Sequence, residues 1–140
     1  LGRQLQIYVN FQMPPKSIES AVFSERMEQA LSYVAYAVGN GLQKGYQIGL
    51  CTNSRMVNGA YYLRFKRQTG SVHYKELLRQ LAKVRMMAGN SFASVIDMDV
   101  REGITGCEIY ILTTYMDESI DEKIGQLERM GNTTRLLLLE

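Results

Sequence analysis

The alternation of short apolar runs with longer amphipathic segments is the feature that most constrains how this chain folds. Residues 5–11 alternate apolar and polar side chains, as strands do, and a helical pattern follows the break at Pro14 and Pro15. The apolar positions of that helical pattern are Met27, Leu31, Val34, Ala35, Val38 and Leu42. Strands that alternate with helices along the chain predict a mainly parallel sheet that is covered on both faces.

Two neighbouring runs, residues 46–53 and 60–67, predict strands joined by a loop over residues 54–59. A loop of this length forms a hairpin, so the strand at 60–67 is expected to be antiparallel and to lie at the edge of the sheet. Its expected inward face carries Tyr61, Leu63 and Phe65.

Two helices are predicted in the middle of the chain. Ser71 is expected to cap the first, which runs to near Gly89, and Ser91 is expected to cap the second, which runs through Val100. Each serine precedes a run of apolar residues at helical spacing.

The last third of the chain predicts a strand, a helix and a final strand. The strands are expected at 108–114 and 133–139, and Ser119 and Glu122 form a capping box at the start of the helix. The resulting order, β-α-β-β-α-α-β-α-β, predicts an open, mainly parallel, twisted α/β sheet with an antiparallel edge strand and helices on both faces. We expect one domain over residues 1–140, and a fragment of a longer protein because Leu1 opens the chain.

The net charge of +2 argues against a dedicated nucleic-acid binder, but the charge is unevenly distributed. Residues 55–85 contain eight bases and one acid, whereas residues 97–140 contain ten acids and four bases. The two cysteines, Cys51 and Cys107, lie in expected buried strands, so we expect two structural thiols in a reducing compartment.

Ligands of open parallel sheets bind beyond the carboxyl ends of the strands. The chain contains neither G-x-G-x-x-G nor G-x-x-x-x-G-K-[ST], and its first strand is not followed by the carboxylates of a phospho-receiver domain. The polar residues expected at this edge, and therefore the candidate site, are Asn10, Gln12, Asn53, Thr113, Thr114 and Asp117.

No catalytic residue and no cofactor is predicted. The single histidine, His73, is expected on the surface at the start of a helix, away from the strand ends. The acids Asp97, Asp99 and Glu102, like the acids near residue 117, are expected to lie on solvated faces.

The edge strand predicted at 60–67 carries a basic face of Arg64, Lys66 and Arg67. Charges on an edge strand prevent strand-to-strand aggregation, which explains them without a ligand. The alternative is a surface for an anionic partner, such as anionic lipid or nucleic acid, whose binding would weaken steeply with salt.

Four stretches of the chain resemble one known family: LQIYVNFQ, ERMEQALSYVAYAVGNGLQKGYQIGLCTNS, YKELLRQLAKVR and CEIYILTTYMDESIDEKIGQLERMGNTTRLL. Together they are similar to the C-terminal part of the DUF58 family, whose core resembles a von Willebrand factor A domain. This resemblance spans nearly the whole chain. It implies a von Willebrand factor A-like, Rossmann-like fold.

In the metal-binding domains of this type, an Asp-x-Ser-x-Ser stretch follows the first strand and an Asp follows the fourth. The resemblance places Asn10, Gln12 and Pro14 at the first three ligand positions and Thr114 at the later one. Amide and hydroxyl groups alone hold a hard cation weakly, so the resemblance implies a degenerate metal-ion-dependent adhesion site and no bound metal.

Members of the resembled family are membrane-anchored proteins that work with MoxR-type AAA+ ATPases. The resemblance therefore implies a non-enzymatic protein–protein interaction domain in the cytoplasm, with a membrane connection only through segments outside this chain. The alternative from the residues is an enzyme or small-ligand binder, which requires a concave pocket at the candidate site.

Overall fold

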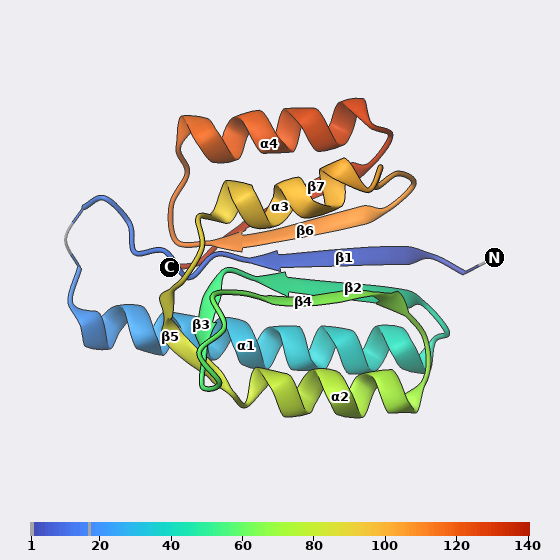
Figure 1. Ribbon diagram of the computed structural model, residues 1–140, viewed down its shortest axis with the longest axis horizontal. Coiled ribbons are helices and arrows are strands. Elements are labelled where there is room, and N and C mark those ends of the chain that lie inside the picture. The colour runs from blue at the N-terminus through green and yellow to red at the C-terminus, as the bar shows by residue number, and fades with distance from the viewer. Residues whose placement is uncertain (1, 17) are drawn as a thin grey trace.

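The computed structural model describes residues 2–16 and 18–140 and has a five-stranded sheet at its centre (Figure 1). Its strands are, in chain order, β1 (Gln4–Val9), β2 (Gln47–Thr52), β4 (Leu63–Gln68), β6 (Glu108–Thr113) and β7 (Thr133–Leu138). In space the order is β4-β2-β1-β6-β7, and all neighbours are parallel except β2 and β4. This confirms the predicted α/β sheet with an antiparallel edge strand.

Helices cover both faces of the sheet, as predicted. On one face α1 (Ser20–Gln43) packs beside α2 (Ser71–Leu81), and on the other α3 (Phe92–Arg101) packs beside α4 (Glu118–Arg129) (Figure 1). None of the helices in the described residues is both long and apolar enough to cross a membrane.

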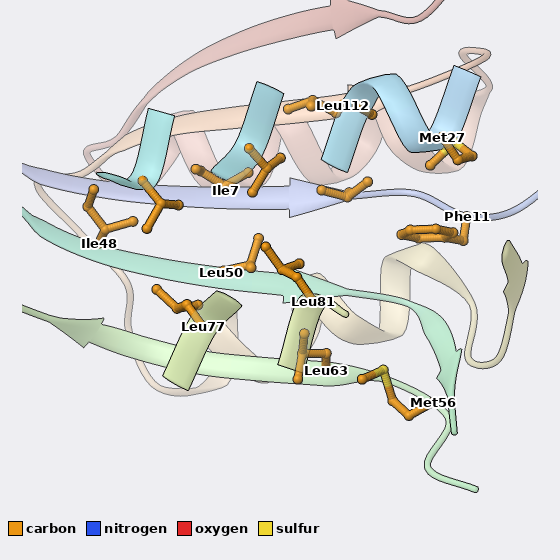
Figure 2. Close-up of a cluster of buried hydrophobic side chains, with 14 of the residues drawn as sticks. Ile7, Phe11, Met27, Ile48, Leu50, Met56, Leu63, Leu77, Leu81 and Leu112 are labelled. Carbon is orange, nitrogen blue, oxygen red and sulfur yellow. The ribbon is translucent and has the colours of Figure 1, made fainter. Parts of the chain in front are cut away.

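Two apolar cores fill the space between the sheet and these helix layers. The core on the α1 face joins residues such as Ile7 and Leu50 from the sheet with Met27 and Leu77 from the helices (Figure 2). The core on the other face contains Ile109 and the fully buried Cys51. Because both faces of β1 and β2 are covered, these central strands are buried throughout most of their length. Both cysteines are buried and free, as expected.

A small second sheet, β3 (Ser54–Met56) and β5 (Val84–Ala88), corrects two predictions. Residues 54–57 were expected in a loop, and the helix that begins at 71 was expected to reach Gly89. The helix ends at Leu81, after which inward Val84, Met86 and Ala88 alternate with exposed neighbours, and this is the period of a strand. The two strands stabilise each other through antiparallel pairing.

The structure corrects two helix caps and confirms a third. Gly70 is the N-cap of α2 in place of Ser71. Its φ of 98° is a left-handed conformation that is costly for a residue with a Cβ, so glycine suits this position. Asp117 caps α4 in place of the predicted Ser119 box, since its carboxylate accepts a hydrogen bond from the Ile120 N–H at 2.8 Å. Ser91 caps α3 as predicted and accepts from the Ser94 N–H.

For two side chains the observed burial is the opposite of the predicted burial. His73 is buried, and its Nε2 lies 2.7 Å from the Ile48 carbonyl oxygen, because it shares the inward face of α2 with Leu77 and Leu81. Tyr61 precedes β4 and is exposed, so it does not share an inward face with Leu63.

The expectation that all three acids of the Asp97 group are solvated is wrong for Asp99, which is only 6% exposed. Its carboxylate accepts hydrogen bonds from the Tyr8 hydroxyl and from Arg64, each at 2.5 Å, and Arg64 also pairs with the exposed Glu102. Burial raises the pKa of the Tyr8 phenol, so this group stays protonated and donates. The network joins β1, β4 and α3.

We predict that Asp99→Ala lowers the free energy of unfolding by about 1–3 kcal/mol, because it leaves the buried Tyr8 hydroxyl without its acceptor and leaves Arg64 with the exposed Glu102 alone. Urea unfolding measures the effect. Glu102→Ala is the matched control, since it removes the other acid on Arg64 but leaves Asp99 in place. Equal destabilisation by both variants would contradict the role assigned to Asp99.

Candidate functional site

The six predicted site residues lie at the carboxyl edge of the sheet, but the structure divides them by accessibility. Asn10, Asn53 and Thr113, at the ends of β1, β2 and β6, are fully buried. Gln12 and Asp117 are exposed, and Thr114 lies between these two groups. The three buried residues come from the three central strands, whose ends meet because the strands are parallel.

The side chain of Asn10 connects the ends of all three central strands. Its Nδ2 donates to Thr113 Oγ1 at 3.1 Å, and its Oδ1 accepts from Asn53 Nδ2 at 3.0 Å and from the Gln12 N–H at 3.0 Å. Asn53 Oδ1 in turn accepts from the N–H of Phe11 at 2.6 Å. We call this set of hydrogen bonds the Asn10 frame.

The frame extends into the loop that follows β6. The Thr113 hydroxyl donates to the carbonyl oxygen of Tyr115 at 2.9 Å, which fixes the turn that leads to the Asp117 cap. Thr114 is different, because its buried Oγ1 has no hydrogen-bond partner within the described residues. The adjacent threonines therefore play different structural roles.

The donor set at this edge does not fit a divalent cation. Both polar atoms of the Asn10 amide are already engaged with protein groups, and Asp117 uses its carboxylate to cap α4. Within the described residues there is also no group of three or more histidines, cysteines or acids placed to hold a metal ion. A cation here would have to break the Asn10 frame and would receive neutral ligands in exchange.

Exposed apolar side chains also lie at this edge, and the sequence patterns did not reveal them. Most of the exposed large hydrophobic residues in the described part of the chain lie here, where the parallel strands end and where β4 and α1 begin. We define the carboxyl rim by these residues: Met13, Val22, Val57, Tyr61, Tyr62, Met87, Met116 and Leu138. Met and aromatic side chains, which make up most of this set, are enriched at protein interfaces.

The basic face predicted on β4 is largely engaged within the molecule. Arg64 pairs with Asp99 and Glu102, and Lys66 lies 3.4 Å from Glu102. Arg67 donates to two glutamine side chains of β1, at 3.0 and 3.1 Å. These contacts reduce the free positive charge that β4 presents.

The two cysteines lie in surroundings that keep their thiols protonated. Burial raises the pKa of the Cys51 thiol, and it also raises that of Cys107, so both favour the protonated, unreactive form.

A cleft of about 670 Å³ lies between α1 and α2, where Tyr36, Asn40 and Tyr74 line it. None of the six predicted site residues lines this cleft.

No protein-family model matches the chain, and no curated protein matches it significantly.

The adjacent threonines allow a matched test of the frame. Thr113→Val removes a hydroxyl that contacts Asn10 and Tyr115, so we predict a loss of about 1–3 kcal/mol in the free energy of unfolding. Thr114→Val removes a hydroxyl without a partner and should be neutral or stabilising. Urea unfolding of both variants measures the difference, and destabilisation by Thr114→Val alone would contradict this assignment.

We further predict that Mg²⁺, Mn²⁺ and Ca²⁺ do not raise the melting temperature in a metal-specific manner. A site filled at a hundred times its dissociation constant would add about 2.7 kcal/mol, which a thermal-shift assay detects. A dose-dependent rise with one metal, abolished in an Asn10→Ala variant, would show that the edge does hold a cation.

Proposed function

We propose that this domain is a non-enzymatic protein–protein interaction module that binds its partner at the carboxyl edge of the sheet. The observation that carries the proposal is the carboxyl rim itself, which brings exposed methionines and tyrosines from separate loops to one edge. Met and aromatic side chains are enriched at protein interfaces. The Asn10 frame is buried and hydrogen-bonded within the domain, so a partner that binds this edge does not have to satisfy its polar groups.

The first partner to test comes from the resemblance to DUF58 proteins. It makes a MoxR-type AAA+ ATPase the leading candidate and places the domain in the cytoplasm, as a module of a membrane-anchored protein. The separation of charge along the chain supports a protein partner, because complementary potentials orient two proteins as they associate.

The test is a pull-down from native lysate with this domain as bait and identification of the retained proteins by mass spectrometry. We predict that the parent domain retains an AAA+ ATPase and that a Met13→Glu/Met116→Glu double variant loses it. Both methionines are exposed, so their replacement puts charge into the interface without disturbing either core.

The matched control is Val72→Glu, because Val72 is 82% exposed at the start of α2, on the opposite edge of the sheet. Circular dichroism establishes that each bait is folded. Retention of the same ATPase by all three baits, or by none, would contradict the proposed docking edge.

A further inference from the structure

The β3–β5 ribbon contributes more residues to the carboxyl rim than any other segment does. We define it as β3 with the following residues 57–62, together with Lys83 and β5. It carries four of the rim residues, Val57, Tyr61, Tyr62 and Met87, and Val57 is 60% exposed. In Figure 1 it stands beside the carboxyl ends of the central strands.

Backbone hydrogen bonds close the ribbon at its ends, and apolar contacts join it to the core. The Gly89 N–H donates to the Asn53 carbonyl at 2.6 Å, and the Asn90 N–H donates to that of Tyr61 at 2.9 Å. On the inward side Val84 and Met86 pack against the α1-face core. The outward face is therefore presented by a fixed scaffold, which lowers the entropic cost of binding.

Three basic side chains of the ribbon have no salt-bridge partner in the described part of the chain. Within the described residues no salt bridge involves Arg55, Lys83 or Arg85, in contrast to the bases of β4. The alternation of buried and outward positions places Arg55 and Arg85 on the outward face with Met87, and the Arg55 guanidinium lies 4.8 Å from the centre of the Tyr61 ring. Positive charge and apolar surface are thus interleaved on one face.

The ribbon also presents an edge for strand addition. In the described part of the chain β5 pairs with β3 and with no other strand, so its outer edge offers backbone donors and acceptors to an incoming extended segment. Strand addition obtains affinity from main-chain hydrogen bonds and specificity from alternate side chains.

We propose that the ribbon binds an extended acidic segment of the partner protein, which adds as a strand to β5. Acidic side chains of that segment lie against Arg55, Lys83 and Arg85, and its apolar side chains lie against Val57, Tyr61 and Met87. This assignment rests on the interaction function proposed above and names the chemistry of the partner.

Acids on the other side of this edge favour a narrow extended segment, rather than a flat anionic membrane, as the ligand of the ribbon. Glu118, Asp121 and Glu122 at the start of α4 are all exposed. An anionic membrane that covered the whole edge would meet these carboxylates, whereas a single extended segment contacts the ribbon alone.

The direct test uses fluorescence anisotropy with a labelled peptide that alternates glutamate with leucine and valine. We expect the peptide to bind the parent domain, and Arg85→Glu to weaken this binding by at least about tenfold because it reverses a charge at the contact. Binding should also weaken as the salt concentration rises. A matched peptide with lysine in place of glutamate should not bind.

The control variant is Lys44→Glu, which reverses an exposed charge just after α1, at the opposite edge of the sheet. Equal weakening by both variants, or no binding of the acidic peptide, would overturn the proposal. Vesicles of phosphatidylserine and phosphatidylcholine form a separate arm. In one outcome the parent domain sediments with these vesicles and fails to bind the peptide, and Arg85→Glu abolishes the sedimentation. That combined result would assign the ribbon to a membrane surface instead.

The pull-down separates this inference from the proposed function. If Arg85→Glu retains the ATPase while Met13→Glu/Met116→Glu loses it, the ribbon assignment fails and the interaction function stands. If both variants lose it, both proposals are supported. If neither variant changes the retained proteins, both fail.

Discussion

The hydrogen bonds of Asn10 are the interaction on which the organisation of this edge depends. Parallel strands end side by side with unpaired polar groups, which must be satisfied by the protein, by a ligand or by water. Here the side-chain amide of Asn10 joins the ends of β1, β2 and β6 and also accepts a hydrogen bond from the Gln12 N–H. The side chain of Asn53 accepts a hydrogen bond from the Phe11 N–H, and the Phe11 ring packs in the α1-face core (Figure 2).

This use of the strand ends determines what the edge can do. Polar groups that satisfy one another do not offer strong ligands to a metal or a substrate, whereas the loops around them project apolar side chains to solvent. This chemistry supports the proposal that a partner protein binds at this edge. The β3–β5 ribbon adds unpaired positive charge to one side of that surface, and α4 adds negative charge to the other. A partner can be oriented by this difference.

Local patterns predicted the sheet because each central strand and each helix carries its own periodicity. The pairing of β3 with β5 joins residues about thirty positions apart through a three-residue strand, which is too short to show a period. The burial of Asp99 likewise depends on Arg64 and Tyr8, which are distant in sequence. His73 could have been placed from its spacing to Leu77 and Leu81, since all three share one helical face.

The candidate site was predictable in position but not in role. Strand ends locate Asn10, Asn53 and Thr113 from sequence, yet only the structure shows that their side chains bond to one another. The carboxyl rim was missed because isolated exposed apolar residues in separate loops follow no period.

The most direct test of the Asn10 frame is hydrogen exchange of the side-chain amides by NMR. Slow exchange at Asn10 and Asn53, with fast exchange at the exposed Gln12, is the predicted result. Equally fast exchange at all three would contradict the internal frame.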